Sequence, residues 1–117
     1  MGRLEAVEGG NWREFIASPL AVLVIGKSDC PACAAWSEEL ETFLAADAEW
    51  GRVRFGKMLL DKGGLIEFKR ANPWLADVDE LPLNVLYTRG ERSKSWPGGG
   101  TDRLVSRLRN LEPEPTP

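Results

Sequence analysis

Hydrophobic residues follow different patterns along the first half of the chain, and each pattern predicts an element. Residues 20–25 are apolar without a break, which is typical of a strand covered on both faces, as in the middle of a parallel sheet. Residues 34–46 repeat apolar side chains every three or four positions, which predicts an amphipathic helix. Residues 53–60 predict a second strand, and residues 12–17 predict a short helix that ends before Pro19.

The second half of the chain predicts two helices and a hairpin. Residues 65–69 form a short helical pattern, and residues 82–87 and 92–96 flank a glycine-containing turn, as the arms of a β-hairpin do. The second arm is polar and precedes a proline, which is consistent with an edge strand. After three glycines, Thr101 is expected to cap a last helix. We therefore predict an α/β fold, with a mixed sheet of about four strands and helices on both faces.

Composition limits the classes of protein and partner. The chain has 117 residues and a net charge of −3, which fits one domain, and its proline-rich residues 112–117 predict a disordered tail. It has no block of lysine and arginine, so we expect no nucleic-acid partner. The longest apolar run, residues 20–25, is too short to span a bilayer, and no signal-peptide segment begins the chain. We expect a cytoplasmic protein without a membrane partner.

The only two cysteines lie between the first strand and the long helix, in Cys30-Pro31-Ala32-Cys33, and the chain has no histidine. If Cys30 opens the helix, its sulfur lies near unpaired backbone N–H groups and the positive end of the helix dipole, which favours the thiolate. Cys33 follows one turn later, where it can attack a mixed disulfide at Cys30. Pro31 suits the first helical turn, where no N–H is needed. The pattern favours a redox site with Cys30 as nucleophile and Cys33 as resolving thiol.

Three other interpretations of the cysteine pair stay open at this stage. A structural disulfide is one, although so short a loop constrains the unfolded chain little. A zinc site needs four ligands, and two cysteines without a histidine supply them only across a dimer. Two reduced, inert cysteines are the third interpretation. The redox interpretation is preferred, because cytosolic cysteine pairs are more often catalytic or metal-binding than permanently bridged.

The order of the predicted elements, together with the cysteine motif, resembles the thioredoxin family over nearly the whole chain. Two further features carry the resemblance: Leu81-Pro82 before the hairpin, and the glycines that follow Trp96. The resemblance implies a thioredoxin-like fold. It also implies that the peptide bond before Pro82 is cis, that Pro82 faces the active-site disulfide, and that Leu81 and Leu83 flank the substrate groove.

Lys57 and Trp36 each have a functional and a structural interpretation. By alternation, Lys57 lies on the apolar face of its strand, and it resembles the family's lysine beside the site. There it would stabilise a thiolate or help to move a proton; otherwise its stem extends to the end of the sheet. Trp36 lies on the apolar stripe of the long helix. It would line the substrate groove or, as its place in the stripe favours, pack in the core.

The chain departs from the thioredoxin pattern at three places. Asp29 precedes the first cysteine, and Pro-Ala lies between the pair, where thioredoxins read Trp-Cys-Gly-Pro-Cys. Asp29 opposes thiolate formation beside it, unless its carboxylate caps the helix. Val24 occupies the place of the family's buried acid, so deprotonation of the second cysteine needs water, Lys57 or another group. The segment between residues 61 and 82 is longer than in a minimal thioredoxin.

The expected function is thiol–disulfide exchange on protein substrates through Cys30 and Cys33. A monomer with a single thioredoxin-like domain over residues 1–111 would exchange disulfides with protein disulfide or dithiol partners. A thiol reductase or a low-molecular-weight thiol would recycle it, and we expect neither a cofactor nor a metal. The alternative is a non-enzymatic thioredoxin-fold module that binds a partner and uses the pair as a redox sensor or structural clip.

Overall fold

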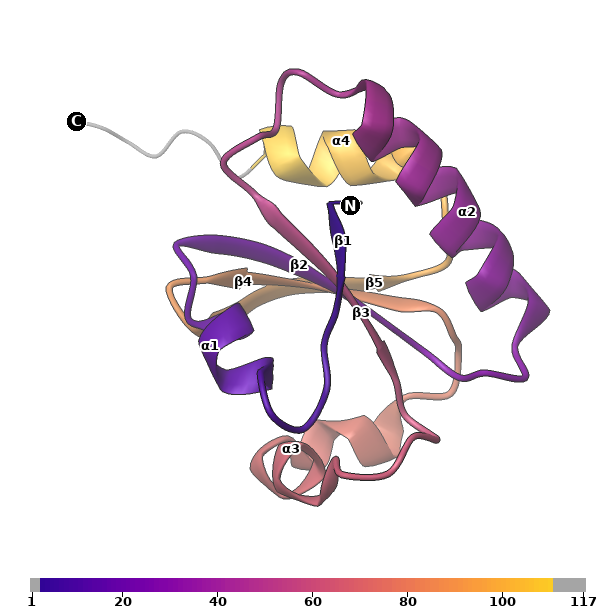
Figure 1. The fold of residues 1–117 in the computed structure, drawn as a ribbon, viewed down its shortest axis with the longest axis vertical. Helices are drawn as coiled ribbons and strands as arrows, with labels where there is room; N and C mark the ends of the chain where they lie inside the picture. The colour runs from indigo at the N-terminus through magenta and orange to yellow at the C-terminus, as the bar shows by residue number, and fades with distance from the viewer. Residues whose placement is uncertain (1–2, 111–117) are drawn as a thin grey trace.

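The computed structural model describes residues 3–110, which form a five-stranded mixed sheet between two layers of helices (Figure 1). The strands lie in the order β1-β3-β2-β4-β5. In chain order the elements are β1 (Leu4–Ala6), α1 (Trp12–Ile16), β2 (Leu20–Gly26), α2 (Pro31–Ala46), β3 (Arg54–Leu59), α3 (Ile66–Ala71), the 3₁₀ helix η1 (Pro73–Asp77), β4 (Leu83–Thr88), β5 (Glu91–Pro97) and α4 (Thr101–Arg109). No helix within the described range is long and apolar enough to cross a lipid bilayer.

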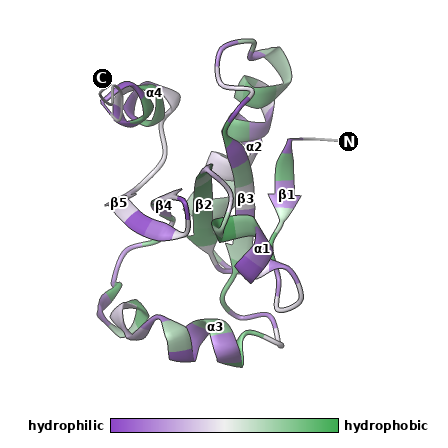
Figure 2. Cartoon of the chain, turned by 90° about the vertical axis from the view of Figure 1, so that its left-hand side faces the viewer, coloured by the Kyte–Doolittle hydropathy of each residue, from purple (hydrophilic) through white to green (hydrophobic). Residues whose placement is uncertain are grey.

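β2 occupies the centre of the sheet because its side chains are apolar on both faces. It pairs in parallel with β3 and antiparallel with β4, and its residues from Ala21 to Ile25 are at most 2% exposed. Figure 2 shows the contrast in hydropathy between the hydrophobic β2 and the edge strand β5, which carries hydrophilic residues. The predicted central strand and the predicted polar edge strand are both confirmed.

The two faces of the sheet pack into two separate hydrophobic cores. On one face, Leu23 packs with aromatic residues of α1 and α3, among them Phe15 and Phe68. On the opposite face, Val22 and Val24 pack with the buried sides of α2 and α4. The helix that begins at the cysteine pair therefore lies on the same face of the sheet as the last helix of the described chain (Figure 1).

The predicted helices and the hairpin are confirmed, with ends that differ by a few residues, as helix ends commonly do. One detail is wrong: Thr101 is the first residue of α4 and does not cap it. The cap is Gly100, whose φ of +119° is a conformation that glycine adopts without a Cβ clash. The predicted tail, residues 112–117, lies outside the described residues.

β1 is a strand that the sequence pattern did not predict. It pairs in parallel with the outer edge of β3, where Leu4 lies opposite Phe55. The guanidinium of Arg54 holds it in place, with Nη2 2.5 Å from the Glu5 carboxylate and Nη1 2.6 Å from Glu14 of α1. Three residues with an acid in the middle carry almost no strand signal, so this strand depends on its neighbour for its conformation.

Candidate active site

Cys30 and Cys33 lie at the junction of β2 and α2, and a disulfide joins them. Cys30 is the N-cap residue of α2, and the backbone N–H of Cys33 donates to Cys30 Sγ over 3.1 Å. Pro31 is the first residue of the helix, where it displaces no hydrogen bond. The sequence placed the pair correctly at a helix N-terminus, and the structure adds that the main chain itself donates to the first sulfur.

The two sulfurs differ in access. Cys30 is half-buried at the tip of the helix, whereas Cys33 is 3% exposed. This geometry separates an accessible sulfur from a protected one. As for metal binding, no group of three or more His, Cys, Asp or Glu side chains between residues 3 and 110 is arranged to hold an ion.

Gly26, the last residue of β2, makes room for the protected cysteine. A Cβ atom at position 26 would lie 2.9 Å from Cys33 Sγ and 3.0 Å from its Cβ, and real Cβ atoms essentially never approach so closely. Cys33 therefore packs directly on the backbone of the central strand. In the sequence, Gly26 is only the end of an apolar run, and such a run does not predict a contact between β2 and α2.

Asp61 fastens the loop before Cys30 to the end of β3. The backbone N–H of Ser28 donates to Asp61 Oδ1 over 3.0 Å, and the Ser28 hydroxyl donates to Asp61 Oδ2. These hydrogen bonds from Ser28, with the positive charge of Lys27, hold the pKa of Asp61 below its ordinary value. Asp29 is exposed and does not cap α2, because Cys30 takes that position, so the suggested capping role of Asp29 is wrong.

Pro82 lies at the same end of the sheet as the cysteine pair. The Leu81–Pro82 bond is cis, which confirms what the resemblance implied. The register pairs Leu83, the first residue of β4, with Ile25, one residue before the end of β2, so Pro82 lies just before β4, beside the turn into α2. The Pro82 carbonyl accepts from the N–H of Gly98 over 2.8 Å. The N–H and C=O of half-buried Leu81 make no hydrogen bond within the described residues.

Trp36 belongs to the core and not to an open groove. It is 3% exposed, and its indole Nε1 donates to Oδ1 of the fully buried Asn84 over 2.8 Å. The Asn84 amide nitrogen in turn donates to the carbonyls of Trp96 and Gly98, at 3.0 and 2.7 Å. This burial contradicts the groove position and confirms the core interpretation. The hydrogen-bond chain joins α2 to the β4–β5 hairpin. The apolar pattern of β4 could not predict it, because Asn84 interrupts that pattern and its partners lie far along the chain.

Lys57 lies on the α2 face of the sheet, beside Val24. The parallel register pairs these two residues, and Val24 is 2% exposed. Lys57 is half-buried, and its Nζ makes no hydrogen bond or ion pair with any residue that the structure describes. Val24 thus leaves no acid at the position where the family has one, as the sequence indicated.

A cavity of about 660 Å³ borders the loop that leads to Cys30. On one side of the cavity lie Lys27, which belongs to that loop, and Asp61, which holds the loop through Ser28. The opposite wall is formed by the end of α3 and by η1. The residues that line it are Lys27, Leu60, Asp61, Lys69, Asn72, Pro73, Leu75 and Ala76. The segment between residues 61 and 82 therefore builds a wall of this cavity, which the sequence pattern did not reveal.

Comparison of the sequence with known proteins finds neither a matching family profile nor a matching curated protein. Comparison of the structure finds thioredoxins. Thioredoxin f2 of Chlamydomonas reinhardtii is similar with a TM-score of 0.73 at 20% identity, over 96% of this chain and 99% of its own. The short form of spinach chloroplast thioredoxin f gives 0.73 at 16% identity, over 93% of both chains.

Mitochondrial thioredoxin 3 of Saccharomyces cerevisiae, in its oxidized form, is similar with a TM-score of 0.70 at 18% identity, over 92% of this chain and 95% of its own. Likeness at such identities establishes a fold and leaves the chemistry to be argued from the site. This chain has each feature on which the resemblance depended: the mixed sheet, the cysteine pair at the start of α2 and the cis bond before β4. The chain therefore has the thioredoxin fold, as the sequence resemblance implied.

Proposed function

We propose that the protein is a thiol–disulfide oxidoreductase that exchanges disulfides with protein substrates through Cys30 and Cys33. One observation carries the proposal: a disulfide joins a half-buried sulfur at a helix N-cap to a buried one a turn later. The thioredoxins among the similar structures support it at the level of the fold. A purely structural clip would not need one of its sulfurs at the surface.

Cys30 is the nucleophile in the proposed reaction. The helix N-terminus offers backbone N–H groups and a positive dipole end, and the N–H of Cys33 already points at Cys30 Sγ. The Cys30 thiolate attacks one sulfur of the substrate disulfide. A mixed disulfide forms, and the other substrate sulfur leaves as a thiolate.

Cys33 resolves the mixed disulfide in the second step. It loses its proton, and its thiolate attacks Cys30 Sγ, which forms the Cys30–Cys33 disulfide and releases the second substrate sulfur as a thiolate. The substrate gains two electrons and the protein loses two. A thiol reductase or a low-molecular-weight thiol, as the cytoplasm supplies, returns the pair to the dithiol, and we propose that the protein works as a monomer without a bound cofactor.

The substrate is proposed to dock against the Pro82 loop. The main-chain N–H and C=O of Leu81 have no partner within the described residues, so they are free to bond to an extended substrate segment. Leu83 is 9% exposed, so it contributes to the floor of such a groove more than to its rim. Pro31 keeps the first turn of α2 free of a donor that would compete for the substrate.

Substitution of Cys33 tests the mechanism directly. Cys33→Ser removes resolution, so incubation with a protein disulfide should trap a covalent adduct on Cys30 that a dithiol releases. Cys30→Ser is the matched control and should trap almost nothing, because Cys33 is buried. Mass spectrometry identifies the adduct and its site. A Cys33→Ser protein that never forms an adduct would contradict the assigned roles.

A second candidate function is a binding module that uses the pair as a redox switch. The observation that favours it is Val24, which is buried and leaves no acid beside the resolving cysteine. Titration in defined thiol buffers, followed by turnover with a reductant, separates the two candidates. An oxidoreductase shows a reversible couple and recycles over many turnovers, whereas a switch reacts once. A potential near about −270 mV would indicate a reductant, and one above about −200 mV an oxidant.

A further inference from the structure

A buried hydroxyl follows the resolving cysteine along α2. Cys33, Ser37 and Glu41 are each four residues apart, so they form one row along a single side of the helix. Ser37 is 6% exposed, and its Oγ makes no hydrogen bond with any residue between 3 and 110. Most buried hydroxyls in proteins have a partner, so an unpaired one directly behind a reactive thiol needs an explanation.

The row faces the β3–β1 side of the sheet. Trp36 turns the other way around the helix axis and reaches β4 through its bond to Asn84. Glu41 lines a cavity together with residues of β1 and β3. Each residue of an α-helix is rotated by about 100° about the helix axis from the one before it, so Ser37 is turned from Trp36 toward Glu41. Because Ser37 is also buried, its hydroxyl lies between α2 and the sheet, on the side of that cavity.

Ser37 and Lys57 lie at about the same distance from the Cys33–Gly26 contact, measured along the strands, so they lie opposite each other. Cys33 packs on Gly26, and Lys57 is the register partner of Val24, two residues further back along β2. α2 runs back over the sheet, because its C-terminal end bonds to the residue before β1. Four helical residues advance about 6 Å and two strand residues about 7 Å, so Ser37 and Lys57 lie at the same depth on facing surfaces.

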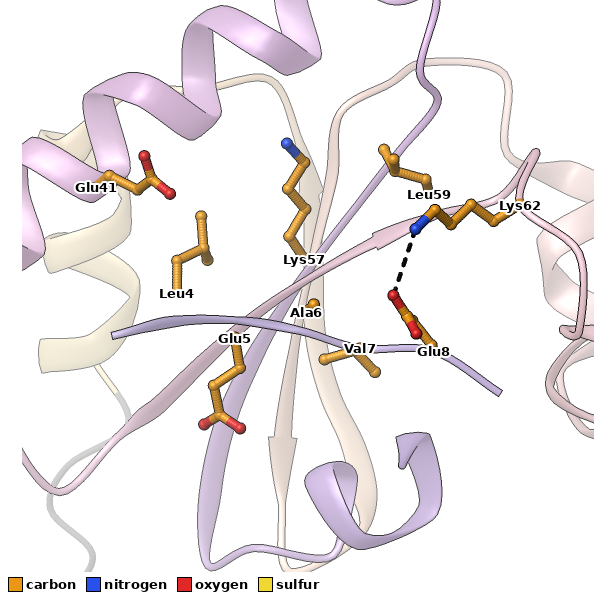
Figure 3. Close-up of a pocket in the computed structure, with 9 residues that line it drawn as sticks. All are labelled: Leu4, Glu5, Ala6, Val7, Glu8, Glu41, Lys57, Leu59 and Lys62. Atoms are coloured by element: carbon orange, nitrogen blue, oxygen red, sulfur yellow. Dashed lines mark hydrogen bonds and ion pairs between the residues drawn. The ribbon is translucent and has the colours of Figure 1, made fainter. Parts of the chain in front are cut away.

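The cavity beside them gives water access to this depth. Figure 3 shows Lys57 pointing toward α2 in a cavity of about 260 Å³, which has room for several water molecules. The other charged groups that line the cavity are Glu41 of α2, Glu5 and Glu8 of the β1 segment, and Lys62 after β3. Glu8 and Lys62 pair with each other over 3.4 Å, and Glu5 points to the opposite side of β1. Glu41 is the remaining charge on the Lys57 side.

We propose that Ser37 is a positioning residue that links the Cys33 thiol, through water, to Lys57 and the cavity. The inference deepens the proposed function and rests on it. In the resolution step, the Cys33 proton passes toward the Ser37 oxygen, and the hydroxyl proton of Ser37 passes on to cavity water beside Lys57. The departing substrate thiolate takes up a proton from solvent, so protons and electrons balance. Ser37 and the cavity would then provide, from the helix side, the path for the Cys33 proton that an acid in place of Val24 would provide from the sheet side.

Two-phase kinetics with dithiodipyridine test this role. The reduced protein is mixed with one equivalent of this neutral chromogenic disulfide, and each released pyridinethione is counted. Attack by Cys30 releases the first, and attack by Cys33 on the mixed disulfide releases the second. The first phase is an internal control for folding and for the nucleophile, since Ser37 takes no part in it.

Ser37→Ala should slow the second phase by about tenfold near pH 6 to 7 and leave the first phase unchanged. The deficit should shrink above about pH 9, where hydroxide ionises a thiol without help. Ser37→Thr, which keeps the hydroxyl, should restore most of the rate. Ser106→Ala, at an exposed serine of α4, is the matched control and should behave as the unmodified protein does. A second phase that is unchanged in Ser37→Ala, or slowed equally at every pH, would overturn the proposal.

Lys57→Gln supplies an independent variant of the same path. If Ser37 and Lys57 act in series, the double variant should be no slower in the second phase than the slower single variant. Additive losses would contradict a shared path. Failure of the proposed function itself looks different, because the unmodified protein would then release only the first pyridinethione.

Discussion

At the scale of single residues, the site depends on groups that are missing as much as on groups that are present. Gly26 has no Cβ, so Cys33 packs against the backbone of the central strand. Val24 has no carboxylate, so Cys33 has no acid beneath it at this position of β2. The burial of Cys33 therefore depends on Gly26. In the proposed mechanism, the Cys33 proton moves by way of side chains of α2 and β3.

Gly26→Ala tests the first of these dependences. The added methyl group would lie 2.9 Å from Cys33 Sγ, so α2 must shift or the rotamer of Cys33 must change. We expect the free energy of unfolding in urea to fall by about 1–3 kcal/mol, as for overpacked cores, and release of the second pyridinethione to slow. Gly51→Ala is the control, because a Cβ there meets no atom within 4 Å. Equal stability of the two variants would show that the close packing at Gly26 is not required.

At the scale of elements, α2 is fixed at both ends. Its N-terminal end carries the cysteine pair, and its C-cap is Asp47. The Asp47 carboxylate accepts from the N–H groups of Glu49 and Trp50, at 3.1 and 2.9 Å, and from the Arg3 guanidinium at 2.9 Å. Asp47 therefore ends the helix through its backbone N–H, which donates to the Leu44 carbonyl over 3.3 Å, while its side chain shapes the turn that follows and joins α2 to the residue before β1.

Asp47→Asn should lower stability in a pH-dependent way. Burial raises the pKa of Asp47, but the hydrogen bonds from Arg3, Trp50 and Glu49 outweigh it, so the pKa lies below its ordinary value. Its contribution is therefore complete above the unfolded-chain pKa of about 3.9 and is lost as the pH falls through the lower folded-state pKa. Urea unfolding at pH 7 should show a loss of about 1–2 kcal/mol that narrows toward pH 3.

Asp79→Asn is the matched control for that titration. Asp79 is exposed and makes no hydrogen bond or ion pair within the described part of the chain. Its substitution should leave stability unchanged at both pH values. A loss in Asp47→Asn that stayed constant from pH 7 to pH 3 would mean that the charge of Asp47 plays no part in holding α2.

Periodicity predicts the elements of this fold better than it predicts the contacts between them. The unbroken apolar run 20–25 and the stripe of 34–46 each follow from local burial, so the central strand and the long helix were predictable. β1 was not, because its pairing with β3 and the Arg54–Glu5 ion pair form between distant parts of the chain. The site divides likewise: spacing indicates the cysteine pair, whereas the anchoring of Ser28 by Asp61 exists only in three dimensions.

At the scale of the whole molecule, charge is divided between two cavities beside the site. The cavity next to the Cys30 loop has two lysines, Lys27 and Lys69, and one acid, Asp61, in its wall. A second cavity, of about 290 Å³, touches Leu83 behind the Pro82 loop and is lined by Asp77, Asp79 and Glu80 together with Arg92. The chain has a net charge of −3, yet the wall of this cavity beside Cys30, the lysine wall, has more positive than negative side chains. An anionic disulfide should be drawn to the lysine side, because local potentials raise association rates.

Lys27→Glu tests this division of charge. With dithiobis(nitrobenzoate), a dianionic disulfide, the rate of the first phase should fall by about tenfold at low salt, and with neutral dithiodipyridine it should change little. The difference between the two probes should largely vanish near 1 M salt, where the screening length falls to about 3 Å. Lys94→Glu on β5 changes the net charge equally, and Lys94 lines neither of the two cavities. If both variants slowed the anionic probe alike, net charge and not the lysine wall would set the preference, and substrates would not be chosen by charge at this site.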